Sequence, residues 1–478
     1  MTNQFGRFVR SPKSEAYDLV ILGSGPGGQK AAIQAAKLGK SVLVIERNKL
    51  GGSCLHLGTI PSKALREAAL AAVADGGSIF RPVMARTNRV LEEECVIIEE
   101  ALRRNGVEFI TGKGSFVDAN RIEIENELGK FIVRGEKIVI AVGTRPRRPP
   151  EIDFDEEVVF DSDTILGLDT QPRSLMVLGA GVIGCEYASI FARMGIRVTL
   201  VENRPQILTS MDEEIVQALL NQFVKSGIDV RLNTKHGEIR KIINPEGRPM
   251  AAVELTGADG KTVTEYVDAV LYCLGRTGNH EDLNLDCIGL EVDARGTIQV
   301  NKNYQTAVPH IYAVGDIIGP PALAASSAEQ GRLAALHAFT GAQAEFPDTF
   351  PFGIYTIPEI SSVGFQEARL AARGTKYVVG KALYSEIARG KMLKDDFGFL
   401  KLVVHAGTHR VVGVQVIGMS ATELVHIGQV AISFGATVEF FVDNVFNYPT
   451  LAEAYKVAAL NAINQLNRPR ARSNRNNG

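Results

Sequence analysis

The sequence predicts an α/β protein in which two βαβ domains are followed by a third, α+β domain. Three observations lead to this prediction: a strand, glycine turn, helix and strand near the N-terminus; a second copy of that pattern near residue 180; and a change to alternating strands and turns from about Phe346. The length of 478 residues accommodates about three domains of roughly 150 residues each.

The first pattern begins with the apolar run Tyr17–Leu22, breaks at GSGPGG, continues with alanines at helical spacing and ends in a strand that closes on Glu46. Its glycines are Gly23, Gly25 and Gly28. In a dinucleotide-binding turn the first glycine permits the tight bend, the second lets pyrophosphate approach, and the third lets helix and strand pack closely. Glu46 follows Gly23 by 23 residues, near the distance at which an acidic residue bonds a ribose hydroxyl.

The second pattern repeats the first. The strand Ser174–Leu178 runs into Gly179, Gly181 and Gly184, and Glu202 again lies 23 residues after the first glycine. In each copy the amino end of the helix would face a phosphate with its free N–H groups. Because both glycine turns have the strand before, the helix after and the acid at the right distance, two Rossmann-like dinucleotide-binding domains are predicted rather than two ordinary turns.

Further buried strands are expected at Lys137–Val142, in VDAVLYCLG and in HIYAVGD. The predicted organisation is a flexible leader at 1–15, a first dinucleotide domain at 16–155 and 278–345, a second at 156–277, a third domain at 346–467 and a disordered tail at 468–478.

Composition indicates an ordinary cytoplasmic protein, with 45% hydrophobic residues, 22% charged residues and a net charge of −2. No membrane or nucleic-acid partner is expected, since no apolar run approaches about 20 residues and the charge is nearly balanced. The basic end, RPRARSNRNNG, leaves a nucleic-acid role for the tail as a minor alternative. The cysteines are odd in number and scattered, which suits a reducing compartment and predicts no metal site. They are Cys54, Cys95, Cys185, Cys273 and Cys287.

Glu202 also bears on the choice of nicotinamide cofactor. A carboxylate placed for a 2′-hydroxyl repels a 2′-phosphate, by about 4 kcal/mol for two unit charges about 4 Å apart at an effective dielectric near 20. Taken alone, Glu202 therefore predicts NAD(H). Arg204 lies two residues further on and could turn toward a 2′-phosphate, so the exclusion of NADP(H) need not be complete.

The segment LGGSCLHLGTIPSKAL resembles the active-site segment of the flavin-dependent pyridine nucleotide–disulfide oxidoreductases, the family of dihydrolipoamide dehydrogenase and glutathione reductase. The resemblance extends over nearly the whole chain, through AVGTRP, GCE, TAVPHIYAVGD and PTLAE. It implies the α/β fold of that family: two Rossmann-like dinucleotide-binding domains, the first for FAD and the second for NAD(P), plus a C-terminal α+β dimerisation domain. A homodimer or larger homo-oligomer is then the expected assembly.

The resemblance also implies roles for single residues. The stretch from Glu46 through Cys54, with Gly52, would line the adenosine and pyrophosphate of FAD. Lys63 would lie near flavin N5 and pair with Glu186, and these two are the catalytic candidates. The alternative is an exposed ion pair of little energetic weight.

Five further positions are carried over as cofactor-binding residues. Asp316 would bond the ribityl chain of the flavin, and Ala324 would lie near its ring. Gly275 would border the nicotinamide dinucleotide, while Gly114 and Gly143 are cofactor-binding glycines without a more specific role.

Two departures from the family pattern point away from disulfide chemistry. The family places a second cysteine where this chain has Thr59, and a hydroxyl forms neither a disulfide nor a thiolate. The family also places a catalytic histidine where this chain has Tyr448, although Glu453 remains. Tyrosine titrates near pH 10 and is a poor general base at about pH 7. Without a dithiol, the histidine has no proton to shuttle.

One branch of the family shows both changes, the soluble, Si-specific NAD(P) transhydrogenases. Its pattern C-x-H-x-GTIPSKALR is matched by Cys54, His56, Thr59 and Arg66, and FNYPT-x-AEAY-x-VAALN is matched from Phe446 to Asn461. The resemblance implies hydride transfer between NADPH and NAD through FAD, by a ping-pong mechanism with Cys54 as a bystander. Glu202 departs from the amide-type residue of that branch.

Three alternatives remain open. An NADH-dependent flavin diaphorase or oxidase, reducing a quinone, a dye or oxygen, fits Glu202 better because it needs no NADP(H). A redox-sensing protein that binds the cofactors without turnover is disfavoured by the presence of Lys63 and Glu186. Disulfide reduction by Cys54 together with another chain's thiol is the third.

Overall fold

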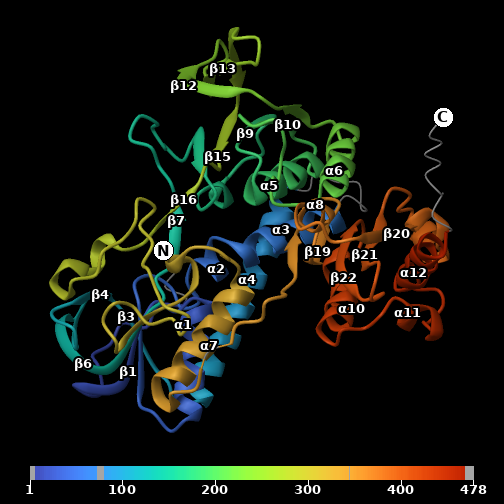
Figure 1. The fold of residues 1–478 in the computed structure, drawn as a ribbon. Helices are drawn as coiled ribbons and strands as arrows, with labels where there is room; N and C mark the ends of the chain where they lie inside the picture. Colours follow the sequence, from blue (N-terminus) through green and yellow to red (C-terminus); the bar gives the residue numbers. More distant parts are fainter. Residues whose placement is uncertain (1–5, 73–79, 344, 469–478) are drawn as a thin grey trace, which may run out of the picture. The chain divides into compact units, whose positions relative to one another are not determined.

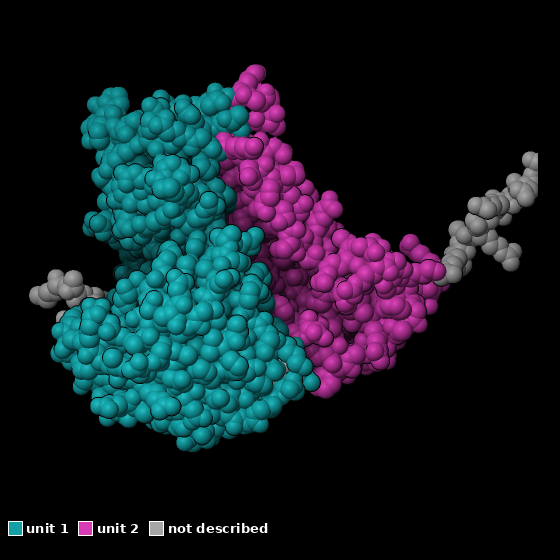
Figure 2. All heavy atoms as spheres, turned by 60° about the vertical axis from the view of Figure 1, so that its left-hand side comes forward, with its two compact units in different colours: residues 1–179, 236–256, 262–346 teal, residues 180–235, 257–261, 347–478 magenta. Residues whose placement is uncertain are grey.

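The computed structural model describes residues 6–72, 80–343 and 345–468. The chain divides into two compact units, coloured separately in Figure 2. Unit 1 holds residues 1–179, 236–256 and 262–346, and unit 2 holds residues 180–235, 257–261 and 347–478.

The largest sheet of unit 1 has seven strands in the order β3-β2-β1-β6-β5-β4, with β17 also beside β6. The strands β3, β2, β1, β6 and β17 are parallel, whereas β4 and β5 join antiparallel. Their bounds are β1 Ala16–Leu22, β2 Val42–Glu46, β3 Glu108–Thr111, β4 Lys113–Phe116, β5 Arg121–Asn126, β6 Gly129–Ile140 and β17 Ile311–Ala313. Leu22 pairs with both Ile45 and Ile140, so these strands end at one edge, directly before Gly23.

Helices α1 and α7 lie side by side over this sheet (Figure 1). They approach most closely at two glycines, because a Cβ added to Gly331 would lie 2.0 Å from the carbonyl oxygen of Gly27. The buried face of α1 carries only small residues, which suits this close packing. The helices of unit 1 are α1 Pro26–Lys37, α2 Gly52–His56, α3 Thr59–Ala72, α4 Phe80–Arg104 and α7 Ala324–Thr340.

The rest of unit 1 contains three smaller groups of strands. Strand β15 pairs in parallel with both β8 and β9, β13 pairs antiparallel with β14 beside β12, and β7 pairs antiparallel with β16. The bounds are β7 Thr144–Pro146, β8 Val159–Asp161, β9 Ser174–Leu178, β12 Lys235–Ile243, β13 Pro249–Thr256, β14 Thr262–Val267, β15 Ala269–Tyr272 and β16 Arg276–Gly278; the short 3₁₀ helices are η2 Ile165–Gly167, η3 Glu281–Leu283, η4 Leu285–Ile288 and η5 Gly315–Ile318.

Unit 2 begins with the helix and second strand of the second βαβ pattern, and β10 pairs in parallel with β11. Its C-terminal part is an antiparallel sheet in the order β18-β19-β22-β21-β20, with helices α10 and α12 packed against it. The bounds are α5 Val182–Arg193, β10 Arg197–Val201, α6 Glu213–Lys225, β11 Asp229–Arg231, β18 Phe352–Ile354, β19 Ile360–Gly364, α8 Glu367–Ala372, β20 Tyr377–Leu383, η6 Tyr384–Glu386, α9 Ala388–Leu393, β21 Phe399–His405, β22 Val411–Ile417, α10 Ala421–Ser433, α11 Glu439–Asp443 and α12 Glu453–Leu466. The predicted fold class is thus confirmed, with parallel sheets followed by an antiparallel α+β region.

The leader differs from the expectation of a flexible segment at 1–15. From Phe8 to Lys13 it follows β3: the N–H of Phe8 donates to Thr111 Oγ1 at 2.8 Å, Arg10 Nε donates to the carbonyl of Phe109 at 2.8 Å, and the N–H of Lys13 donates to Glu108 Oε1 at 3.0 Å. The Phe8 ring also packs edge-on against Phe109, with 4.8 Å between centroids. These contacts span about a hundred residues, so local sequence does not reveal them. Residues 1–5 and the expected disordered tail beyond residue 468 lie outside the described residues.

Helix α4 was not predicted, although its sequence carries a signal. The buried residues recur at successive spacings of three, four, eight and seven residues, which keep one helical face; they are Phe80, Val83, Thr87, Cys95 and Leu102. Within the ranges that the structure describes, none of the helices has the length and apolar character needed to cross a bilayer.

Candidate functional site

The first glycine turn leaves an open space at the amino end of α1. A Cβ on Gly23 would lie 2.4 Å from the carbonyl oxygen of Ala141, and one on Gly28 would lie 2.0 Å from the carbonyl oxygen of Gly23. Gly25 is the N-cap of α1, offers no side-chain cap and has nothing within 4 Å of an added Cβ. Helix N–H groups at such an end are suited to a phosphate.

Glu46 closes this turn from the end of β2. Its Oε2 accepts from the N–H of Ser24 at 2.9 Å and from Ser24 Oγ at 2.7 Å, and its Oε1 accepts from the N–H of Asn48 at 2.9 Å. The backbone of Gly52 also lies here, since its added Cβ would be 3.2 Å from the Cα of Gly25. The structure therefore brings Gly25, Glu46 and Gly52 together, and it adds Ser24, which the motif contained but sequence reasoning did not single out.

Cys54 lies on α2 and faces Thr59 at the start of α3. Burial, aided by the charge of Asp316, raises the pKa of the Cys54 thiol to about 11, against the opposing effects of a hydrogen bond with Thr59 and the charge of Lys63. None of the five cysteines, all in described parts of the chain, forms a disulfide. Because the thiolate is the reactive form, Cys54 is held as an inert thiol.

Alkylation of Cys54 in the native protein is expected to be slow at about pH 8 and to accelerate only near the raised pKa, because iodoacetamide reacts with the thiolate. Mass spectrometry of the Cys54 peptide across pH measures this, with the exposed Cys287 as the internal reference. Equal labelling of both cysteines at about pH 8 would show that Cys54 is activated.

Lys63 belongs to unit 1 and Glu186 belongs to unit 2. Lys63 is on α3, and its Nζ donates to Ser62 Oγ at 3.4 Å. Glu186 is a buried residue of α5, and its Oε1 accepts from the N–H of Tyr355 at 2.9 Å. Glu186 thus holds the backbone beside β18, and its pairing with Lys63 stays a prediction.

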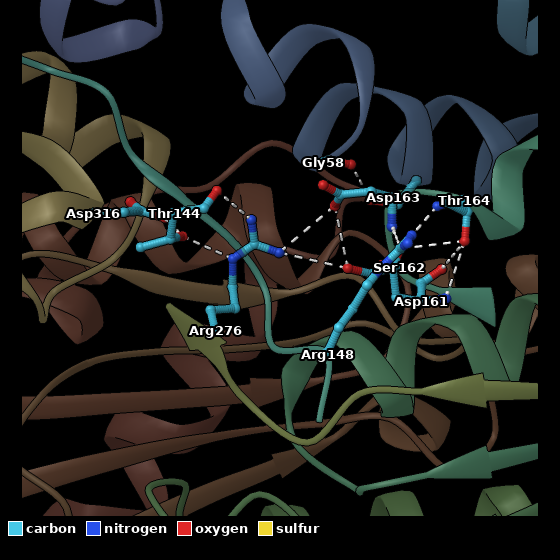
Figure 3. Close-up of polar contacts among 10 residues, drawn as sticks. Gly58, Thr144, Arg148, Asp161, Ser162, Asp163, Thr164, Arg276 and Asp316 are labelled. Carbon is cyan, nitrogen blue, oxygen red and sulfur yellow. Dashed lines mark hydrogen bonds and ion pairs between the residues drawn. The ribbon is translucent and has the colours of Figure 1, made fainter. Parts of the chain in front are cut away.

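Asp316, in η5, belongs to a polar network that Figure 3 shows. Thr144 Oγ1 donates to Asp316 Oδ2 at 3.3 Å, and Arg276 binds Thr144 twice, at 2.8 Å from Nε to Oγ1 and at 2.8 Å from Nη2 to the carbonyl. The neighbours of these residues are Gly143 and Gly275, so both predicted glycines border the network. Arg276 follows Gly275 in the CLGR motif, and its position beside a glycine predicted to bind a cofactor was the signal available in the sequence.

The same guanidinium reaches the loop after β8. Arg276 Nη1 lies 3.5 Å from Ser162 Oγ and 3.7 Å from Asp163 Oδ1 (Figure 3). Burial raises the pKa of Asp163, and Arg276 opposes that shift. Asp161 organises this loop by accepting the N–H groups of Asp163 and Thr164 at 2.8 and 3.0 Å. The network therefore links η5, β7 and the loop after β8 through one cation.

Gly114 and Ala324 were also predicted to bind a cofactor, and their positions in the fold do not by themselves indicate such a role. Gly114 lies inside β4, where an added Cβ would be 2.6 Å from Leu22 Cδ2, so a larger residue here would displace a core side chain. Ala324 is the first residue of α7. Their assignment to a cofactor stays a prediction.

The second glycine turn repeats the first. Gly179 has a φ of 102°, and an added Cβ would lie 2.8 Å from Leu274 Cδ2. Gly181 is the N-cap of α5, offers no side-chain cap and has nothing within 4 Å of an added Cβ, while Gly184 is buried in the first turn of the helix. This turn too is suited to a phosphate.

Glu202 follows β10 and is 2% exposed. Its Oε2 accepts from the N–H of Ala180 at 2.9 Å, and Arg204 binds both carboxylate oxygens, each at 2.9 Å. Burial opposes the charged carboxylate, but the hydrogen bonds of Arg204 and Ala180 outweigh it and lower the pKa of Glu202. The carboxylate is therefore charged and already neutralised by a neighbour.

Tyr448, at the position of the family histidine, is 74% exposed. Glu453 begins α12, and its Oε2 accepts from the N–H of Thr450 at 3.4 Å. Glu453 thus has a local role in starting the helix that needs no histidine.

Two family models match the chain. Residues 17–331 match the pyridine nucleotide-disulphide oxidoreductase family, and residues 350–459 match the dimerisation domain of that family.

Proteins named soluble pyridine nucleotide transhydrogenase are similar over most of the chain. The one from Mycobacterium bovis (strain BCG / Pasteur 1173P2) is 46% identical over 94% of this chain and 98% of its own length. The one from Marinomonas sp. (strain MWYL1) is 43% identical over 94% of this chain and 99% of its own length.

Solved structures share the fold. The HOCl-induced flavoprotein disulfide reductase RclA from Escherichia coli, as a Cu(II) complex, superposes with a TM-score of 0.85 at 26% identity, over 94% of this chain and 100% of the other. LpdA from Mycobacterium tuberculosis does so with a TM-score of 0.83 at 26% identity, over 94% of this chain and 99% of the other.

Proposed function

Because this chain belongs to the pyridine nucleotide-disulphide oxidoreductase family, we propose that it binds FAD and a nicotinamide dinucleotide and transfers hydride from NADPH to NAD⁺. The observation that carries the proposal is the pair Cys54 and Thr59. A lone thiol with a pKa raised to about 11 provides no disulfide stage beyond the flavin. Relatives with 43–46% identity that are named soluble pyridine nucleotide transhydrogenases support the same reaction.

The first glycine turn fits FAD. Gly25 leaves room for a pyrophosphate at the amino end of α1, which no side chain caps. Glu46 would bind a ribose hydroxyl. Thr144 orients Asp316 through a hydrogen bond to its Oδ2. When bound, FAD supplies a carrier that takes up a hydride from one nicotinamide and yields it to another.

The chain's own residues then have positioning and electrostatic tasks. Lys63, with Glu186 behind it, would place a positive charge at the reacting edge of the flavin. The turn at Gly179, Gly181 and Gly184, with Glu202, would hold the nicotinamide dinucleotide, and Gly275 would border it. The reaction NADPH + NAD⁺ → NADP⁺ + NADH moves one hydride and no net proton, so a tyrosine at 448 in place of a general base is no obstacle.

We propose the following organisation: an FAD-binding domain at 16–155 and 278–345, an NAD(P)-binding domain at 156–277, and an interface domain at 346–467. The match to a dimerisation domain at 350–459 supports a homodimer. A cytoplasmic location and the absence of a nucleic-acid partner belong to the same proposal.

Anaerobic stopped-flow absorbance tests the reaction. NADPH is expected to bleach the flavin band of the holoprotein, and thio-NAD⁺ added afterwards is expected to restore it while thio-NADH appears. The Cys54→Ser variant should behave like the parent protein. Failure of NADPH to bleach the flavin, with NADH still effective, would refute the transhydrogenase.

A second candidate function is an NADH-dependent diaphorase or oxidase, which needs no room for a 2′-phosphate beside the buried carboxylate of Glu202. It predicts bleaching by NADH alone and reoxidation by a quinone, a dye or oxygen. The same experiment separates the two functions.

A further inference from the structure

The segment at residues 6–13, which we call the strap, joins two parts of unit 1. Phe8 binds Thr111, the last residue of the edge strand β3, in both directions: its N–H donates to Thr111 Oγ1 at 2.8 Å, and its carbonyl accepts the N–H of Thr111 at 3.0 Å. Two residues earlier, the carbonyl of Gly6 accepts the N–H of Leu50 at 2.8 Å. The strap therefore runs from the edge of the large sheet to the loop between β2 and α2.

Leu50 is fixed through both of its main-chain groups. Its side chain is buried, and its carbonyl accepts from His56 Nε2 at 2.8 Å and from Cys95 Sγ at 3.8 Å. The strap supplies the acceptor for its N–H through the carbonyl of Gly6. Because a buried N–H that loses its acceptor carries a desolvation penalty, a displaced strap would draw Leu50 with it or leave that N–H unsatisfied.

The position of Leu50 is transmitted to the first glycine turn. The next residue, Gly51, donates its N–H to Ser24 Oγ at 2.9 Å, and Ser24 Oγ donates to Glu46 Oε2 at 2.7 Å. Hydrogen bonds thus connect the strap, through the peptide between Leu50 and Gly51, to the carboxylate that would bind a ribose hydroxyl of FAD. The strap acts on the candidate site through this loop.

Two residues anchor the strap. Gly6 is buried with a φ of 79°, and an added Cβ would lie 3.1 Å from Cys95 Sγ, so both its conformation and its surroundings favour glycine. The ring of Phe8 packs edge-on against Phe109 and contacts the apolar core that includes Leu50. A substitution at either residue is therefore expected to loosen the strap.

We propose that the strap is a positioning element for FAD, which keeps the loop at 47–51 in the arrangement that presents Glu46 and Gly52 to the adenosine half of the cofactor. This inference rests on the proposed function, in which the first glycine turn binds FAD. Gly6 and Phe8 are then positioning residues, since they act on the cofactor through Leu50. A loop that is held in place slows the release of the cofactor, and differences in affinity are expressed mostly in the rate of release.

The variant Gly6→Val tests the strap, because a β-branched residue is disfavoured at a positive φ and its Cβ would crowd Cys95. Exchange of bound FAD for radiolabelled FAD measures the rate at which the holoprotein releases its cofactor. Release is expected to be faster by about tenfold, which corresponds to about 1.4 kcal/mol. Bleaching of the FAD-saturated variant by NADH should change by less than about threefold, since the strap acts at the adenosine end of the cofactor.

Two further variants and a control accompany Gly6→Val. Phe8→Ala removes the ring that packs on Phe109 and should also accelerate release. Gly6→Asn should recover part of the slow release, because asparagine tolerates a positive φ better than valine does. The control Arg7→Ala lies in the same segment, where Arg7 and its partner Glu127 have side chains 41% and 64% exposed, and it should release FAD at the parental rate.

Hydrogen exchange followed by mass spectrometry reports on the loop itself. The peptide that contains residues 47–51 should exchange faster in Gly6→Val than in the parent protein, whereas Arg7→Ala should keep the parental protection. Unchanged protection of this peptide in Gly6→Val would contradict the role of the strap in holding the loop.

Parental release rates in both Gly6→Val and Phe8→Ala would overturn the inference. A loss of NADH bleaching as large as the gain in release would also overturn it, because it indicates a general distortion of unit 1. The proposed function fails separately. If the parent protein holds FAD but NADPH does not bleach it, the transhydrogenase is refuted, while the release rates still decide the role of the strap.

Discussion

Replacing Lys401 with alanine is expected to lower the free energy of unfolding by about 3–5 kcal/mol. Lys401 is on β21 with its side chain 1% exposed, and its Nζ lies 2.6 Å from Asp212 Oδ1 and 2.8 Å from Glu367 Oε1. Asp212 is itself buried and is the N-cap of α6, where its Oδ1 accepts from the N–H of Ile215 at 3.4 Å. Removal of the lysine would leave that carboxylate buried without a cation.

Chemical denaturation followed by circular dichroism measures this loss. The matched control is Lys381→Ala, a partly exposed lysine paired with Glu214 in the same region, which should cost less than about 1 kcal/mol. Burial opposes the charge of Lys401, but its hydrogen bonds with Asp212 and Glu367 prevail and raise its pKa above 10.5. The contribution to stability is therefore fully present below the unfolded-state pKa and is lost as the pH rises through the raised value. Equal effects of the two substitutions would contradict the buried cluster as a source of stability.

Gly28→Ala is expected to abolish flavin binding and to destabilise the first βαβ turn. The added Cβ would lie 2.0 Å from the carbonyl oxygen of Gly23 and 3.3 Å from Ile21 Cγ2. A main-chain oxygen of the same turn cannot move aside as a side chain can. Overpacking of this kind costs about 1–3 kcal/mol, and here the strain falls on the turn that would hold the pyrophosphate. The ratio of flavin to protein absorbance after purification and the thermal unfolding midpoint report the two effects.

The substitution Gly25→Ala distinguishes the effect of a steric clash within the protein from the effect of lost space for the ligand. Nothing lies within 4 Å of an added Cβ at Gly25, so the apoprotein should unfold at nearly the same temperature as the parent. The methyl group would nevertheless project into the space at the end of α1, and flavin binding should weaken. A fully flavin-loaded Gly28→Ala protein of parental stability would show that this turn does not depend on close packing of helix and strand.

Much of the candidate site could be predicted because its signals are local. A glycine turn between strand and helix, followed by an acid at the end of the next strand, sets Gly23, Gly25, Gly28 and Glu46 within one short stretch, and the structure brings them together. The same reasoning could have identified Ser24, since it lies between two of those glycines. Arg276 and Thr144 were not, because they are 132 residues apart and meet only when β7 pairs with β16.

The sequence by itself determined the two βαβ patterns, the α+β character of the C-terminal domain and the absence of a second cysteine at Thr59. These features follow from periodicity, turn chemistry and residue type, which act over a few residues. Only the tertiary structure decided that Arg204 covers Glu202, that residues 8–13 follow β3, and that Lys401 is buried among Asp212, Glu214 and Glu367. The physical reason is that the effect of a charge depends on its burial and on which opposite charges share its surroundings. Packing sets both, and for Lys401 and Asp212 it does so across 189 residues of chain.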